Sequence, residues 1–272
     1  MTPPLIAFVG GGNMAESLIG GLLARGHPAE RLRVADPAAE RRERLAARGV
    51  PVQADNEPVL PGADWVVLAV KPQVVPAVAR QIAPRLESHT ALVSIAAGVP
   101  TAAFARWFGP RRALVRAMPN TPALVGEGAT ALFANDAVTP AQRDQAEALF
   151  AAVGATCWVE EEAHLDAVTA LSGSGPAYFF LLVEVLAQAG ADLGLPAAVA
   201  RQLAAQTLQG SAALLKREGV EPAELRRRVT SPGGTTERAL AVLAEEGFAA
   251  LVGRAVAAAR ERARELAGEI EP

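Results

Sequence analysis

Short apolar runs alternate with amphipathic stretches over the first 160 residues, and this alternation allows few folds. Each run ends at a glycine, a proline or a polar residue. Strands of a parallel sheet show this pattern, because helices cover both faces of the sheet. The expected strands are Leu5–Val9, Leu32–Ala35, Trp65–Val70, Ala91–Ile95 and Ala113–Ala117, with Ala129–Ala134 and Thr156–Val159 extending the same sheet. The sequence therefore predicts an α/β domain with a doubly wound parallel sheet over residues 1–160.

The pattern changes after the acidic stretch 160–162. From residue 163 to 272, apolar residues recur every three or four positions with almost no β-branched run, which predicts helices alone. Glycines and prolines separate the expected helices, which are Ala177–Leu193, Pro196–Lys216, Pro222–Val229, Thr235–Glu246 and Phe248–Ala267. The sequence predicts an all-helical second domain over residues 163–272.

The segment Ala177–Leu193 is apolar on nearly every side. A helix of this kind has to be buried, and a domain of this size has little interior to bury it in. We therefore expect it to pack against a second subunit. Packing on the first domain is the alternative.

Composition excludes several classes of function. Hydrophobic residues make up 51% of the chain, charged residues make up 20%, and the net charge is −3. This balance gives no electrostatic footprint for nucleic acid or an anionic membrane. The single cysteine, Cys157, excludes an internal disulfide, and the three histidines are too far apart to suggest a metal centre. The longest apolar run, Ala177–Val183, is far short of the roughly 20 residues of a membrane span. Since the N-terminus lacks the marks of a signal peptide, we expect a cytoplasmic protein without nucleic-acid or membrane partners.

A glycine-rich turn follows the first expected strand and opens a helix. Its pattern is G-x-G-x-x-A, from Gly10 to Ala15, with Asn13 and Met14 at the helix start. Gly10 would allow the tight turn, and Gly12 would let the backbone approach a pyrophosphate at the helix N-terminus. The motif predicts dinucleotide binding in a Rossmann-like domain. A purely structural turn is the alternative.

Asp36 ends the second expected strand, where such domains carry the acid that binds the adenosine ribose. A carboxylate there accepts bonds from both ribose hydroxyls and repels a 2′-phosphate, which favours NADH. Arg41 and Arg42 follow one turn later and could instead reach a 2′-phosphate. The alternatives are a helix cap for Asp36 and a solvated helix face for the two arginines.

Lys71 is one of only two lysines in the chain and follows the buried run Trp65–Val70. Ligands of open α/β sheets bind at the carboxyl ends of strands, so Lys71 is a candidate contact to cofactor or substrate. An ordinary cation at the end of a strand is the alternative. The small residues 96–98 follow another strand and would let a nicotinamide ring lie flat.

Two strings in the second half are dense in glycine and hydroxyl groups. Residues 171–178, LSGSGPAY, precede the most apolar helix, and Ser174 could simply be its N-cap. Residues 230–236, TSPGGTT, stand at the start of another expected helix. Free N–H groups and hydroxyls at such a place form a concave site for a carboxylate.

Taken together, these strings resemble the pyrroline-5-carboxylate reductase family over essentially the whole chain. The resemblance rests on IAFVGGGNMA at 6–15, AVKPQ at 69–73, SIAAGV at 94–99, RAMPNTP at 116–122, DAVTALSGSGPAY at 166–178 and ELRRRVTSPGGTTERAL at 224–240. It implies NAD(P)H-dependent reduction of 1-pyrroline-5-carboxylate to L-proline, the last step of proline synthesis. It also implies a Rossmann domain and a helical dimerisation domain in a homodimer, often assembled into a decamer. Many members have Ser or Asn-Arg where this chain has Asp36, so the usual preference for NADPH over NADH stays open.

The motifs and the resemblance together give a set of site residues. The candidate cofactor residues are Gly10, Gly12, Asn13, Met14, Asp36, Asn56, Val70, Lys71, Pro72, Ala97 and Gly98, and the candidate substrate residues are Glu162, Thr169, Ser231, Gly234, Thr235 and Thr236. Lys71 and Thr236 are the catalytic candidates. Thr236 would hydrogen-bond the imine nitrogen of the small cyclic imino acid. A protonated imine is already electrophilic, so positioning against the hydride donor suffices, and the proton can come from solvent.

Two other functions fit parts of the pattern. A β-hydroxyacid dehydrogenase or a broader imine reductase shares the domain plan, and the hydroxyacid enzymes use a lysine on a helix of the second domain. The only lysine there is Lys216, at a charged helix end, which argues against this class. A nucleotide-binding regulatory protein without turnover is the second alternative.

Overall fold

The computed structural model describes residues 2–269. Residue 1 and residues 270–272, the outer ends of the two predicted domains, lie outside the described residues. The chain forms two compact units, Met1–Ser174 with Ala259–Pro272, and Gly175–Ala258. Each unit is described by itself.

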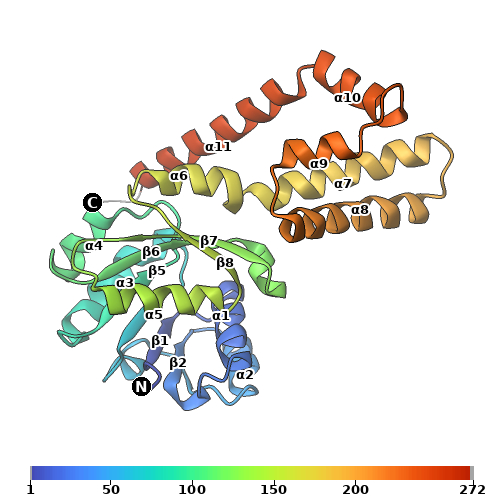
Figure 1. Cartoon of the computed structure of the whole chain (residues 1–272). Helices are drawn as coiled ribbons and strands as arrows, with labels where there is room; N and C mark the ends of the chain where they lie inside the picture. The colour runs from blue at the N-terminus through green and yellow to red at the C-terminus, as the bar shows by residue number, and fades with distance from the viewer. Residues whose placement is uncertain (1, 270–272) are drawn as a thin grey trace. The chain divides into compact units, whose positions relative to one another are not determined.

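The first unit contains one eight-stranded sheet in the order β3-β2-β1-β4-β5-β6-β7-β8 (Figure 1). Its strands are β1 (Ile6–Val9), β2 (Leu32–Ala35), β3 (Val52–Gln53), β4 (Trp65–Leu68), β5 (Ala91–Ser94), β6 (Leu114–Met118), β7 (Gly128–Ala134) and β8 (Gly154–Trp158). Short 3-10 turns lie between them at Ala29–Arg31, Glu57–Val59, Pro72–Val74, Ala83–Arg85 and Thr121–Val125. The first six strands pair in parallel.

The predicted doubly wound parallel sheet is confirmed as a mostly parallel one, with two differences from the expectation. Strand β7 runs antiparallel to β6, and β8 then pairs in parallel with β7. The sequence did not show this reversal, because an apolar run has the same pattern in either direction. Strand β3 was also missed, since two residues are too few to give a period.

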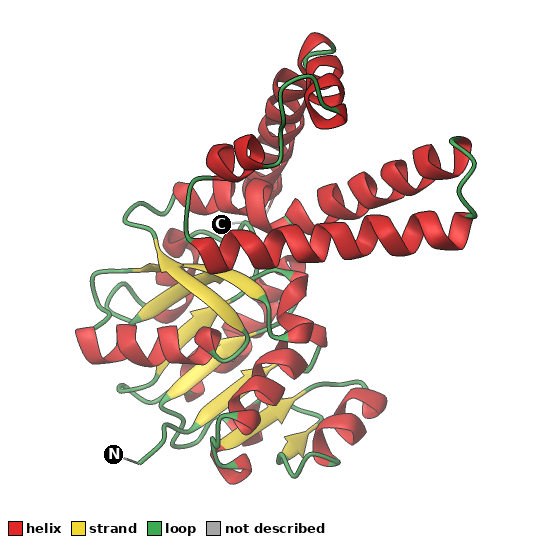
Figure 2. Ribbon diagram, turned by 45° about the vertical axis from the view of Figure 1, so that its right-hand side comes forward, coloured by secondary structure: helices red, strands yellow, loops and turns green. Residues whose placement is uncertain are grey.

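Helices cover both faces of the sheet (Figure 2). Ile6 and Phe8 of β1 pack in one buried cluster with helices α1 (Asn13–Ala24), α2 (Ala39–Ala46) and α5 (Pro140–Ala151). Ala7 and Val9 face the other way, toward α3 (Val75–Ile82) and α4 (Thr101–Phe108). Since successive side chains of a strand point to opposite faces, a strand buried on both sides has to be continuously apolar.

A long helix leads out of the first unit. It consists of α6 (His164–Val168), a π-helical turn (Thr169–Gly173) and α7 (Gly175–Asp192). The sequence predicted a helix only from Ala177, with Ser174 as one choice of N-cap. That choice is wrong, because Ser174 has helical backbone angles and its N–H donates to the Thr169 carbonyl. Among the described residues, only His164–Asp192 is long and apolar enough to cross a membrane, by length and composition alone.

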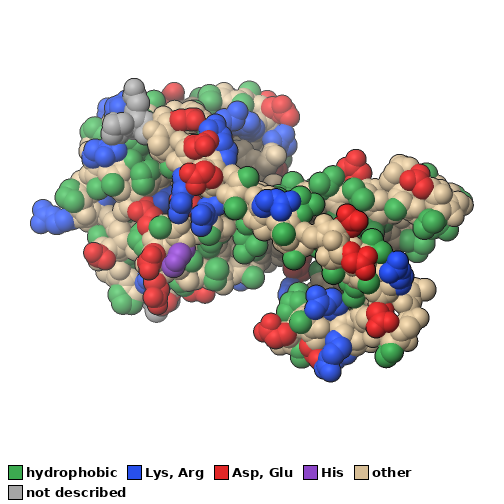
Figure 3. Space-filling view, turned by 90° about the horizontal axis from the view of Figure 1, so that it is seen from above, with side chains coloured by type: hydrophobic (Ala, Val, Ile, Leu, Met, Phe, Trp, Pro, Cys, Tyr) green, Lys and Arg blue, Asp and Glu red, His purple; other side chains and the backbone are tan. Residues whose placement is uncertain are grey.

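The second unit contains α7, α8 (Ala197–Glu218), α9 (Pro222–Arg228), α10 (Thr235–Glu245) and the first half of α11 (Phe248–Glu269). Its residues are all described, and only Gly175, Ala187 and Ala200 among them are buried. Large apolar side chains of α7 are exposed, and hydrophobic side chains are visible on this part of the chain in Figure 3. They include Phe179, Phe180, Leu181, Val185 and Leu186. One copy of this unit therefore has almost no core of its own.

Two adjacent glycines of α1 test how closely this helix is packed. A Cβ on Gly21 would lie 2.6 Å from the Ala152 carbonyl oxygen, whereas a Cβ on Gly20 would meet only the end of the Arg48 side chain. We expect Gly21→Ala to lower the free energy of unfolding by about 1–3 kcal/mol, because backbone has to move. Gly20→Ala should change it by less than about 1 kcal/mol, since a guanidinium moves easily. Urea denaturation at equal protein concentration measures both, and equal losses would contradict the argument.

Candidate active site

Five turns of the first unit meet at one edge of the sheet. Strands β1 to β5 are parallel neighbours, so their carboxyl ends lie together. In sheet order, these ends are followed by Asn56, Asp36, Gly10–Gly12, Val70–Pro72 and Ala97–Gly98. Ligands of open α/β sheets bind at this edge. The structure thus brings together the candidate cofactor residues, which are spread over 89 positions of the sequence.

The glycine turn after β1 shows two different needs for glycine. Gly10 has φ = 101°, and a Cβ on it would lie 2.5 Å from the Ala69 carbonyl oxygen, so the fold itself requires glycine there. A Cβ on Gly12 would meet no atom within 4 Å. Gly12 is the N-cap of α1, and no side chain caps that helix. Packing therefore does not explain Gly12, whereas the approach of a ligand to the backbone would.

Asp36 is a buried carboxylate, only 2% exposed. Its Oδ2 accepts from the Gly11 N–H at 2.8 Å, and its Oδ1 accepts from the Ala38 N–H at 2.9 Å. Burial opposes the charge, but these N–H groups and the guanidinium of Arg41 outweigh it and hold the pKa of Asp36 below its usual value. The carboxylate thus ties the glycine turn to the turn after β2. The N-cap of α2 is Ala38, which has no capping side chain.

The two arginines of α2 lie against the same turn. Arg41 Nη1 is 3.3 Å from Asp36 Oδ2. Arg42 Nη1 donates to the backbone carbonyls of Asp36 and Pro37 at 2.7 and 2.8 Å. Arg41 therefore stands beside the carboxylate, and Arg42 holds the backbone of the same turn.

The other cofactor candidates differ in how the protein holds them. Asn56 donates through Nδ2 to the side chain of Gln81 at 2.8 Å. Lys71 is exposed and directly precedes a 3-10 turn that begins at Pro72. A Cβ on Gly98 would lie 3.4 Å from the backbone of Ala267 in α11, so this helix packs close to the turn after β5.

Glu162 is the centre of a polar cluster. Its Oε1 accepts from the Thr101 N–H, the Thr101 hydroxyl and the Arg116 guanidinium, each at 2.6 Å. Burial disfavours the charge of Glu162, yet the bonds from Thr101 and the charge of Arg116 outweigh it and lower the pKa of Glu162. The sequence reasoning missed Thr101 and Arg116, although an arginine inside an expected strand was a usable signal. The cluster joins α4, β6 and the segment before α6.

The remaining substrate candidates lie in two places. Thr169 is in the π-helical turn of the first unit, and its hydroxyl donates to the Leu165 carbonyl at 2.8 Å. The residues from Ser231 to Thr236 lie in the second unit, where Gly234 is the N-cap of α10 and no side chain caps the helix. The Gly233 N–H donates to the Glu237 carboxylate at 2.7 Å. The first turn of α10 thus offers uncapped N–H groups beside threonine hydroxyls.

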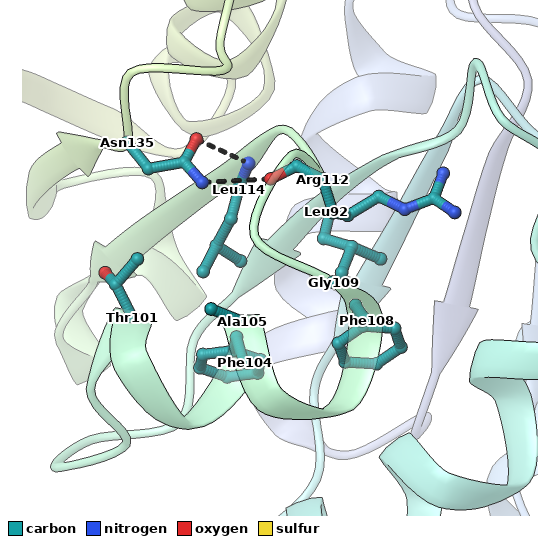
Figure 4. A pocket seen from close by; sticks show the side chains of 9 residues that line it. All are labelled: Leu92, Thr101, Phe104, Ala105, Phe108, Gly109, Arg112, Leu114 and Asn135. Carbon is teal, nitrogen blue, oxygen red and sulfur yellow. Dashed lines mark hydrogen bonds between the residues drawn. The ribbon is translucent and has the colours of Figure 1, made fainter.

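One small pocket lies elsewhere, between α4 and strands β5 and β6, and Figure 4 shows its lining. Asn135 crosses one side of it, accepting from the Leu114 N–H and donating to the Arg112 carbonyl. None of the candidate site residues lines this pocket. Among residues 2–269, no group of three His, Cys, Asp or Glu side chains could hold a metal ion.

The Glu162 cluster predicts a dependence on pH. Because its pKa is lowered in the folded state, Glu162 stabilises the fold above its unfolded pKa of about 4.3, and this contribution is lost as the pH falls through the lowered value. We expect Glu162→Gln to reduce the free energy of unfolding at pH 7 by about 1–3 kcal/mol, since it leaves Arg116 without its carboxylate. The deficit should shrink below about pH 4.

Glu161→Gln is the matched control for this measurement. The Glu161 side chain is 75% exposed, and its ion pair with His164 is 4.0 Å long. Its replacement should change the free energy of unfolding by less than about 0.5 kcal/mol. A Glu162→Gln deficit that stays constant from pH 7 to pH 3 would contradict the assigned pKa direction.

Comparisons with known proteins agree with this arrangement. A family model described as pyrroline-5-carboxylate reductase dimerisation matches residues 162–266, and one described as NADP oxidoreductase, coenzyme F420-dependent, matches residues 5–98. The pyrroline-5-carboxylate reductase of Pseudomonas aeruginosa is 51% identical over 99% of both chains.

Solved structures give the same result. The pyrroline-5-carboxylate reductase structure from Coxiella burnetii has a TM-score of 0.94 and 41% identity, covering 97% of this chain and 98% of its own. The Plasmodium falciparum pyrroline carboxylate reductase, described with NADP bound, has a TM-score of 0.86 and 30% identity, covering 98% and 99%. At this identity and coverage, the chain belongs to the pyrroline-5-carboxylate reductase family.

Proposed function

We propose that this chain reduces 1-pyrroline-5-carboxylate to L-proline with NAD(P)H, the last step of proline biosynthesis. The observation that carries the proposal is the glycine turn after β1, in which Gly12 leaves approachable backbone at the uncapped start of α1. Family membership supports it, because relatives of matching length are named for this reaction.

The residues at the sheet edge fit a nicotinamide dinucleotide. The N–H groups at the start of α1, from Gly12 to Met14, would bind the pyrophosphate, because a helix N-terminus favours anions. Asn56, Lys71 and the turn at 97–98 would lie along the nicotinamide half. When bound, the reduced cofactor supplies the hydride.

Asp36 has a supporting role in this proposal. Its oxygens already accept from Gly11 and Ala38, so it would shape the glycine turn and act on the cofactor through that turn. Arg41 stands next to it and offsets its charge near an adenosine ribose. Both NADH and NADPH therefore remain cofactors of the proposed reaction.

The loop from Ser231 to Thr236 is the proposed substrate site. Uncapped N–H groups at the start of α10 would hold the carboxylate of the substrate, and the Thr236 hydroxyl would hydrogen-bond the ring nitrogen. A threonine hydroxyl is a poor acid, so Thr236 orients the imine rather than protonating it. Rate enhancement comes from holding the imine carbon against the hydride donor. Glu162 and Thr169 support the substrate step in this proposal.

The same proposal includes assembly and location. We place the cofactor domain at residues 1–160 and the substrate-binding and dimerisation domain at residues 163–272. The exposed apolar side chains of α7 would be covered by a second copy, giving a cytoplasmic homodimer that can assemble into a decamer. The match of residues 162–266 to a dimerisation model supports this over a membrane for the same helix.

A steady-state assay tests the reaction directly. Purified protein should oxidise NADH and NADPH when 1-pyrroline-5-carboxylate is added, and proline should appear in equal amount. The ratio of kcat/KM for the two cofactors gives the preference. A protein that binds NADPH but does not turn over the imine would be a nucleotide-binding protein of another function.

Two substitutions in the substrate loop should separate binding from chemistry. A Cβ on Gly234 would lie 3.0 Å from the Ser231 carbonyl oxygen, so Gly234→Ala should distort the loop and chiefly raise the substrate KM. Thr236→Val keeps the shape and removes the hydroxyl, so kcat should fall by roughly ten- to a hundredfold if the bond strengthens in the transition state. Thr236→Ser should retain most activity. Wild-type kinetics for Thr236→Val would refute the role of the hydroxyl.

Self-association should depend on α7. Phe180 is 67% exposed in one copy, and Phe180→Ser should raise the dimer dissociation constant by at least tenfold, because buried aromatic side chains dominate interface energies. Val125→Ser is the control, since Val125 is 78% exposed but lies in the first unit. Sedimentation velocity over a dilution series measures both. A wild-type protein that is fully active as a monomer would overturn the assembly proposal.

A further inference from the structure

The helix formed by α6, the π-helical turn and α7 lacks one backbone hydrogen-bond donor, and a side chain supplies a donor in its place. Pro176 has no N–H, and it stands four residues after Ser172, so the Ser172 carbonyl lacks its regular helical donor. The π-helical turn Thr169–Gly173 ends three residues before this proline, which is the second residue of α7. A turn of this kind is uncommon and is often found at functional sites.

Asn120 supplies the missing donor. It follows strand β6, and its Nδ2 donates to the Ser172 carbonyl at 3.1 Å. Its Oδ1 accepts from the Ala129 N–H at the start of β7 at 2.8 Å. The Ala129 N–H can only donate, so it must face the oxygen of the amide, and this fixes which end of Asn120 meets Ser172. The side chain therefore joins the sheet to the π-helical turn.

Close packing strengthens the same junction. A Cβ on Gly173 would lie 2.5 Å from Cε of Met118, the last residue of β6. Within the turn, the Thr169 carbonyl accepts from the Ser174 N–H at 2.8 Å. Thr169, a candidate substrate residue, is thus held by a turn that Asn120 and Met118 support.

We propose that Asn120 is a positioning residue of the reductase. Its side-chain amide replaces the N–H that Pro176 lacks and so holds the π-helical turn 169–173 in position. The proposal rests on the proposed function and adds to it a residue outside the cofactor turn and the substrate loop. Asn120 acts through Thr169 and the start of α7. Its loss should therefore impair the use of the imine more than the binding of the cofactor.

Asn135 offers a matched control within the same sheet. It follows β7 and also bridges two backbone groups, accepting from Leu114 at 3.1 Å and donating to Arg112 at 2.9 Å. It borders the small pocket of Figure 4, which none of the candidate site residues lines, although Thr101, a hydrogen-bond partner of Glu162, does. Asn120→Ala and Asn135→Ala each remove one amide that bridges a backbone N–H and a backbone carbonyl, so they should lower the free energy of unfolding by similar amounts. A difference between their kinetic constants then comes from where the two side chains lie.

The experiment compares four variants of the full-length protein with wild type. Asn120→Ala should lower kcat/KM for the imine by about five- to tenfold, the effect of one hydrogen bond, while the NADPH Kd changes by less than about twofold. Asn120→Asp keeps the oxygen for Ala129 and lacks the donor, so it should show the same loss. Asn135→Ala should leave kcat/KM within about twofold of wild type.

Recovery of kcat/KM by a second substitution separates the proposed role from a general loss of stability, which Pro176→Ala would not reverse. Pro176→Ala restores an N–H four residues after Ser172, so the double variant Asn120→Ala with Pro176→Ala should regain at least half of the lost kcat/KM. Hydrogen exchange at the Ser174 amide should be about five- to tenfold faster in Asn120→Ala and unchanged in Asn135→Ala.

Specific results would overturn the proposal. They are wild-type kcat/KM in Asn120→Ala, an equal kinetic loss in Asn135→Ala, or no rescue by Pro176→Ala. An inactive wild-type protein would instead count against the proposed function. Hydrogen exchange at Ser174 still decides the role of Asn120 in that case, because unchanged exchange in Asn120→Ala would show that the turn does not depend on it.

Discussion

Strand β1 pairs in parallel with β2 on one side and β4 on the other, and this pairing decides where chemistry can occur in the first unit. It brings the turns after the three strands to one edge. Gly10 has no room for a Cβ against Ala69 because the turn after β1 crosses the end of β4. On the other side, Asp36 accepts from Gly11. The glycine turn is therefore held from both neighbouring strands before any ligand binds, and such a preorganised site loses less entropy on binding.

The second unit, unlike the first, has almost no buried core in one copy. Its helices satisfy their own backbone hydrogen bonds, but only three of its residues are buried in one copy. At about 25 cal/mol for each Å² of apolar surface, side chains such as Phe180 gain little from folding alone and much from association. This fits the match of residues 162–266 to a dimerisation model. The helix His164–Asp192, which is long and apolar enough to cross a membrane, accordingly lies in the segment that matches a dimerisation model.

Much of this arrangement could be predicted from the sequence. The apolar runs and their glycine, proline or polar ends gave the strands to within about two residues, because burial on both faces dictates composition directly. Spacing alone identified Gly10 and Gly12. The direction of β7 could not be predicted, since an apolar strand carries no sign of its direction. The Asn120 bridge was also hidden, because it joins residues 52 positions apart. Pro176 gave no warning of it, because the expected helix began one residue later, at Ala177, whereas α7 begins at Gly175 and includes the proline.

The way the helices begin links the fold to the proposed chemistry. Helix α5, which carries none of the candidate residues, starts with a full capping box between Thr139 and Gln142. Helices α1 and α10 have instead Gly12 and Gly234 as N-caps, with extended backbone and no capping side chain. A serine or aspartate at either position would satisfy one of the free N–H groups and stabilise the helix by roughly a few tenths of a kcal/mol relative to glycine. The same side chain would occupy the N–H groups that a phosphate or a carboxylate needs. Helices α2, α4, α8 and α9 also begin without a capping side-chain hydrogen bond, but their N-cap residues carry side chains, whereas Gly12 and Gly234 carry none. Under the proposed function, glycine at these two N-caps leaves the N–H groups open to a phosphate and to a carboxylate.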